Sequence, residues 1–105
     1  MNKKDEKLIK AICIKYSDRA NEIERGSLGN PNRERYLARC IELNNAVDGG
    51  LALCPDATVR AVVKKALLDG HYTHKAGLCP VGINQFYALR RAVMEEIAKR
   101  LFLIV

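Results

Sequence analysis

The chain has 105 residues, of which 49% are hydrophobic and 29% are charged, and it carries a net charge of +6. This length supports one domain with a modest core, and this composition excludes a disordered chain. Positive charge permits contact with nucleic-acid phosphates. No apolar run reaches the ~20 residues that span a membrane, and no leader-like segment follows Met1. We therefore expect a cytoplasmic protein with no membrane partner.

The cysteines are scattered and form no C-x-x-C pair, which favours reduced thiols packed as small apolar residues. His71, His74 and Cys79 lie close in sequence, but a fourth metal ligand is missing at any familiar spacing. No glycine-rich phosphate loop, paired carboxylates or activated nucleophile is recognisable. We expect neither a metal, nor a cofactor, nor enzymatic activity. The four cysteines are Cys13, Cys40, Cys54 and Cys79.

The first predicted helix covers residues 5–25. Its apolar side chains recur at steps of three and four residues, which places them on one helical face. Two glycines, Gly26 and Gly29, then indicate a helix end and a loop. The predicted inner face consists of Ile9, Ile12, Cys13, Tyr16, Ala20 and Ile23.

A second helix is predicted to begin at Pro31, because Asn30 is a good N-cap and proline fits the first helical position. The sequence Asp48-Gly49-Gly50 predicts its end, and residues 51–54 then form a short buried connector. Its predicted apolar stripe consists of Tyr36, Leu37, Cys40, Ile41, Leu43 and Val47.

A third helix is predicted over residues 57–68, with Asp56 as its cap. The β-branched Val59, Val62 and Val63 also admit a strand. Polar residues at helical spacing and the following Gly70 favour the helix. Its predicted inward positions are Val59, Val62, Val63, Ala66 and Leu67.

The last third of the chain predicts a helix-turn-helix. Thr73 can cap a short helix through Leu78, residues 80–82 supply the turn, and a long helix runs from Ile83 to the chain end. Ala76 suits the crossing of the two helices, and Cys79 and Val81 flank the turn. The predicted buried stripe of the long helix is Ile83, Phe86, Leu89, Val93, Ile97, Leu101 and Ile104.

With that stripe buried, the early turns of the long helix present side chains suited to a DNA major groove. Asparagine and glutamine pair with adenine, arginine pairs with guanine, and alanine contacts the thymine methyl group. Residues 71–105 also hold five basic and two acidic side chains. The predicted base contacts are Asn84, Gln85, Ala88 and Arg91, and the predicted phosphate contacts are Thr73, Lys75, Tyr87 and Arg90.

The stretch NQFYALRRAVMEEIAKRLFLI at residues 84–104 resembles the C-terminus of phage late-gene transcriptional regulators of the ArpU and RinA type. That region is similar to the helix-turn-helix of sigma-factor region 4. The resemblance implies a DNA-binding regulator in a bacterial host cell. Lys75, Pro80 and Gly82 depart from the family pattern around the turn. The residues that match it are Phe86, Tyr87, Arg90, Arg91, Ile97, Ala98 and Leu101.

Other interpretations remain open for the same residues. The arginines can form a solvated face, with Arg91–Glu95 and Glu96–Arg100 pairs. The basic face can instead bind a protein, such as host RNA polymerase or a defence complex, or the chain can be a purely structural bundle. The apolar residues 101–105 can pack on Ile9, Ile12 and Tyr16, and can also form a homodimer contact.

These observations together predict an all-α single domain covering residues 1–105, with about four main helices. Residues 1–54 would brace a helix-turn-helix unit formed by residues 55–105. The predicted function is sequence-specific binding of double-stranded DNA in a phage or prophage transcription programme, with a recognition helix that starts near Ile83.

Overall fold

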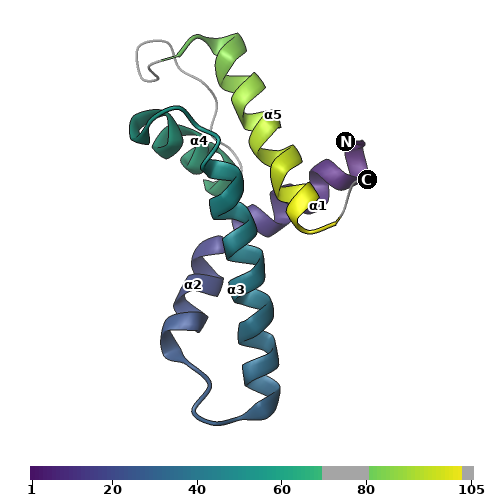
Figure 1. The fold of residues 1–105 in the computed structure, drawn as a ribbon, viewed down its shortest axis with the longest axis vertical. Coiled ribbons are helices and arrows are strands. Elements are labelled where there is room, and N and C mark those ends of the chain that lie inside the picture. The colour runs from purple at the N-terminus through teal and green to yellow at the C-terminus, as the bar shows by residue number, and fades with distance from the viewer. Residues whose placement is uncertain (70–80, 103–105) are drawn as a thin grey trace.

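The computed structural model describes residues 1–69 and 81–102, which form five helices and contain no strand. The prediction of a small all-α bundle is confirmed. α3 joins two regions: its first half pairs with α2, its second half packs on α5, and α1 contacts both α4 and α5 (Figure 1). The helices are α1 (Lys3–Ile14), α2 (Tyr16–Arg25), α3 (Pro31–Leu51), α4 (Ala57–Asp69) and α5 (Ile83–Arg100).

The molecule is elongated, 48 Å in its longest dimension and 22 Å in its shortest, because one helical pair extends away from the rest (Figure 1). We call this pair the arm and define it as residues 16–45, which comprise α2, the connecting loop and the first half of α3. The remaining described residues form the body, in which α1, α4, α5 and the second half of α3 enclose the main core.

The starts of two helices are confirmed. The Asn30 side chain accepts hydrogen bonds from the backbone N–H groups of Asn32 and Arg33, at 3.0 and 3.3 Å. Asp56 does the same for α4, where its carboxylate accepts from the N–H of Val59 at 2.9 Å. In both cases a short polar side chain satisfies N–H groups that the first helical turn leaves without a partner.

The prediction of one continuous helix over residues 5–25 is wrong. The chain leaves helical geometry at Lys15, with φ −88° and ψ 6°, and the expected four main helices become five. Polar bonds from the arm stabilise the break: the Arg19 guanidinium donates to the Ile12 carbonyl, and the Asn44 amide donates to the Tyr16 carbonyl at 3.2 Å. These carbonyls lie on the two sides of the break.

The helix predicted to end at Asp48-Gly49-Gly50 includes these three residues and ends one residue later, at Leu51. Gly50 is buried against α5, and a Cβ atom there would lie 2.8 Å from the Val93 carbonyl oxygen and 2.7 Å from Cγ1 of Ile97. The glycine therefore permits close approach of two helices. Leu51 and Cys54 are buried as expected, but Leu53 is half exposed.

The body core confirms most of the predicted apolar positions, including Val59, Val63, Phe86, Val93 and Ile97. Four residues predicted to face inward are instead exposed, namely Ala20, Tyr36, Ile41 and Ile83. The first three lie on the arm, which has only two helices, and Ile83 lies where the start of α5 extends beyond the core. Two polar residues that are not among the predicted inner positions are buried, namely Arg19 and Asn44.

The last helix ends at Arg100 and does not run on through Phe102, which has φ +58° and is exposed. Leu101 is buried in the same core cluster as Ile9, and Ile12 and Tyr16 pack against that cluster. A direct contact of Leu101 with these residues of α1 and α2 stays a prediction. Residue Ile104 lies outside the described residues.

Three of the four cysteines are buried free thiols, as predicted: Cys13, Cys40 and Cys54. Burial raises the pKa of Cys13 to about 11 and also raises the pKa of Cys54, so these two thiols stay protonated and act as core residues. The predicted short helix over residues 73–78, the first residue of the predicted turn and the fourth cysteine fall within residues 70–80, outside the described part.

Candidate nucleic-acid interface

The first two turns of α5 form an exposed helical edge, which Phe86 and the partly buried Leu89 attach to the body core. Phe86 is fully buried, whereas Ile83 and Tyr87 on its two sides are 54% and 42% exposed. The Phe86 and Tyr87 rings meet edge to face, with centroids 5.1 Å apart. Gly82 provides the N-cap with extended backbone and no capping side chain. The start of α5 therefore presents its side chains to solvent on most of its circumference.

All four predicted base-contact residues are exposed on α5: Asn84, Gln85, Ala88 and Arg91. Residues 84, 88 and 91 follow one another at steps of four and three, so they form one stripe along the helix, and residue 85 flanks it. This stripe, which we call the α5 outer stripe, faces away from the buried Phe86 and Val93. Nothing in the fold of the described residues covers it.

Arg91 forms the intrahelical pair that the solvated-face interpretation predicts. Its Nε donates to the Glu95 carboxylate at 3.1 Å, and Arg100 pairs in the same way with Glu96 at 3.2 Å. The Arg91 side chain remains 65% exposed. Exposed pairs at this spacing contribute only about 0.3–0.5 kcal/mol, so Arg91 can exchange its partner at little cost.

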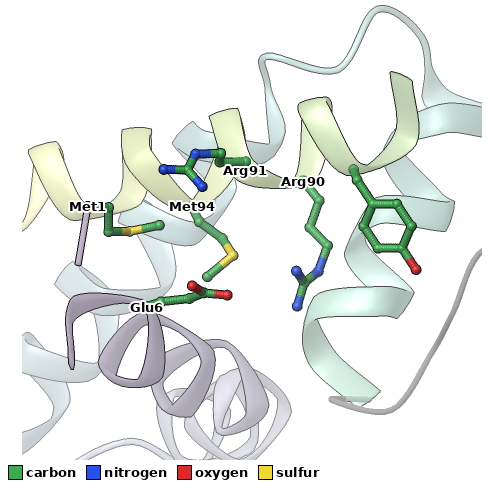
Figure 2. A pocket seen from close by; sticks show the side chains of 6 residues that line it. Met1, Glu6, Arg90, Arg91 and Met94 are labelled. Carbon is green, nitrogen blue, oxygen red and sulfur yellow. The ribbon is translucent and has the colours of Figure 1, made fainter. Parts of the chain in front are cut away.

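Arg90 points to a different side of α5, into a cleft between this helix and the start of α1 (Figure 2). The cleft has a volume of about 230 Å³, and Arg91 lines it together with Met1, Glu6, Tyr87 and Met94. Among the described residues, no carboxylate forms an ion pair with Arg90. Sequence reasoning placed Arg90 with the phosphate contacts but did not anticipate that α1 forms the opposite wall.

Glu6 is the acidic group of this cleft, and its carboxylate already forms an ion pair within α1. Its carboxylate pairs with Lys10, one helical turn along α1, at 3.1 Å. This hydrogen bond, together with the nearby Arg90 and Arg91, holds the pKa of Glu6 below its ordinary value. The carboxylate is therefore charged at neutral pH, and the three cations around it leave the cleft net positive.

The charge of the chain is distributed unevenly between the two regions. Residues 1–15 contain five lysines and two acidic residues, and α5 contains four basic and two acidic residues. The arm has five arginines and five carboxylates, so it is neutral. α4 contains three basic residues and one acidic residue, so the excess positive charge lies on the body helices α1, α4 and α5. The contact between α1 and α5 forms the cleft. The lysine-rich start of the sequence was the signal that could have placed α1 at this interface.

Two predicted phosphate contacts, Thr73 and Lys75, lie outside the described residues, as do His71, His74 and Cys79. Among residues 1–69 and 81–102, no helix combines the length and the apolar composition that crossing a bilayer requires. Comparisons of the chain with protein-family models, with curated proteins and with solved structures give no match.

Proposed function

We propose that the chain is a sequence-specific DNA-binding regulator, of the phage or prophage kind that its last third resembles, and that the start of α5 enters the major groove. The observation that carries this proposal is the α5 outer stripe, where amide, methyl and guanidinium groups suited to base edges lie together and exposed. Base-reading helices need such side chains free of the core.

The positive edge formed by α1 and α5 supports the same proposal. In this arrangement Arg90, together with the lysines of α1, would contact the DNA backbone beside the groove, while Asn84, Gln85 and Arg91 read bases. Tyr87 borders the same cleft and its hydroxyl group can donate to a phosphate. The weak Arg91–Glu95 pair would open when Arg91 binds a guanine.

Fluorescence anisotropy with a pool of random duplexes, followed by selection and sequencing, tests the proposal. We expect the logarithm of affinity to fall linearly with the logarithm of salt concentration, because phosphate contacts release counterions. Replacing Arg91 with alanine should cost ~1–3 kcal/mol and relax the preference at one base pair, whereas Arg90→Ala should reduce the salt slope by about one.

The matched control is Arg35→Ala, since Arg35 is an exposed arginine on the neutral arm and should leave DNA affinity unchanged. Absence of salt-dependent binding in every duplex tested would refute the DNA proposal. Equal losses for Arg35→Ala and Arg91→Ala would refute the role of the α5 outer stripe.

The arm favours a second candidate function, binding to a host protein such as RNA polymerase. Its tip presents Leu28, which is 98% exposed, and its sides present Tyr36 and Ile41, at 51% and 44%. Exposed apolar side chains on a projecting pair of helices are typical of interaction surfaces. Binding of purified polymerase that is lost on Leu28→Asp but kept on Arg91→Ala would favour this candidate.

A further inference from the structure

Arg19 is an unusual buried cation at the base of the arm. The whole Arg19 residue is only 8% exposed. Its Nε donates to the Asn44 side chain at 2.7 Å and its Nη2 donates to the Ile12 carbonyl, and both partners are neutral. Among the described residues no carboxylate forms an ion pair with it. A guanidinium removed from water without a counter-charge is costly to the fold.

One end of this guanidinium remains accessible. Neither of these two hydrogen bonds uses Nη1, and the described residues contain no fully buried side-chain nitrogen or oxygen without a partner. Nη1 therefore retains access to the cleft that Arg19 lines. That cleft lies between α2 and α3 and has a volume of about 420 Å³. It is separate from the α1–α5 cleft, and no step of the proposed DNA contact uses it.

The walls of the α2–α3 cleft are mostly apolar, and its other charges are already compensated. Leu43, Cys40 and the ring of Tyr36 line it beside Arg19. The other cations also line it, but Lys15 pairs with Asp18 at 3.7 Å and Arg39 pairs with Glu42 at 3.0 Å. Arg19 therefore supplies about one net positive charge, at the inner end of an apolar cleft.

We propose that this cleft binds a small organic carboxylate, with its charged group on Arg19 and its apolar body between Tyr36 and Leu43. A carboxylate matches the planar N–H pattern of a guanidinium and would provide the missing counter-charge. The single uncompensated charge favours a monoanion over a phosphate dianion. The volume is within the usual range for small-ligand sites. The ligand would lie beside the break between α1 and α2, which Arg19 also stabilises.

Titration of the whole protein with sodium hexanoate, followed by ¹⁵N-resolved NMR, tests this site. We expect a saturable shift of the Arg19 Nε–H signal and of the Tyr36 and Leu43 amides, with a Kd of about millimolar order. Hexanol has the same chain without the charge and should give no saturable shift. Inorganic phosphate should bind more weakly than hexanoate. Absence of saturation, equal response to hexanol, or tighter binding of phosphate would overturn the proposal.

Substituting Arg19 itself can unfold the arm, so the charge of the site is better changed from its exposed rim. Glu42→Gln frees Arg39 and should tighten hexanoate binding about two- to fivefold, whereas Arg39→Gln leaves Glu42 unpaired and should weaken it by a similar factor. Glu34→Gln, on an exposed part of the arm away from the cleft, is the matched control and should change nothing. Effects of the reverse sign would contradict the site.

Discussion

The body and the arm are stabilised by different interactions, although α3 runs through both. In the body, sixteen buried apolar residues from α1, α3, α4, α5 and the α3–α4 connection form one core cluster. The arm contributes none of these sixteen, although it buries two apolar residues of its own, Leu37 and Cys40. Its two helices are joined by buried polar bonds at the base, between Arg19 and Asn44, and by an ion pair near the tip, between Arg33 and Glu22 at 2.5 Å.

This difference shows how a two-helix projection can hold one conformation with little apolar burial. A directional bond between buried groups fixes the relative position of two helices, since each partner would otherwise lose its bond to water. Arg33 illustrates this at the tip, because it also donates to the Gly26 carbonyl at 2.8 Å and so ties α3 to the end of α2. The body depends on packing, and the arm depends on individual polar bonds.

The largest expected effect tests packing in the body. Gly50→Ala should lower the free energy of unfolding by about 3 kcal/mol, because its Cβ would meet the backbone oxygen of Val93 and force α3 and α5 apart. Urea unfolding measures this. The control is the neighbouring Gly49→Ala, whose Cβ meets only the end of the Arg100 side chain; it should gain up to ~1 kcal/mol in helix propensity. Equal destabilisation by both would contradict close packing at Gly50.

A smaller effect, confined to the arm, is expected for Asn44→Leu. It leaves the Arg19 Nε–H and the Tyr16 carbonyl without their partner and should cost about 1–2 kcal/mol. Hydrogen exchange should then accelerate in α2 while α5 keeps its protection. Asn45→Leu changes an exposed neighbour and should leave both unchanged. Uniform acceleration across α2 and α5 would mean that the two regions unfold together.

The smallest effect is expected at the tip of the arm and has the opposite sign. Leu28 adopts φ +52°, a left-handed conformation that asparagine tolerates better than leucine, and its side chain makes almost no contact. Leu28→Asn should therefore raise the free energy of unfolding by ~0.5 kcal/mol, whereas Leu28→Ala should leave it unchanged. Thermal unfolding distinguishes the two. A loss of stability in Leu28→Asn would indicate that the leucine side chain contributes to the fold.

Local sequence signals predicted the all-helical fold and several helix starts, because a cap acts within one turn. Asn30 with Pro31 and Asp56 each marked a boundary that the structure confirms. The position of Gly49 and Gly50 inside the last turn of α3 could not be predicted in the same way. Gly49-Gly50 has the composition of a helix stop, but Gly50 meets α5, about forty residues further along the chain, and that contact is invisible to a local pattern.

The buried polar pair was missed for a similar reason. Arg19 is not among the inner positions predicted from the apolar periodicity of residues 5–25, because that pattern selects apolar side chains. Its partner Asn44 lies on α3, 25 residues along the chain, so a local pattern cannot reveal the bond. For the candidate interface, sequence spacing predicted that Asn84, Gln85, Ala88 and Arg91 lie exposed, and they do. Spacing could not place α1 beside Arg90, because that proximity depends on tertiary packing. Base and phosphate contacts themselves remain predictions.

The buried thiols have a practical consequence for kinetics. Cys13 and Cys54 belong to the body core, whereas Cys40 is buried in the arm. A thiol reagent modifies only the deprotonated and accessible form, so each of these cysteines reacts only when its surroundings open. The alkylation rate of Cys40 would therefore report how often the arm opens, and the rates of Cys13 and Cys54 would report how often the body opens. No engineered cysteine or added probe is needed for this measurement.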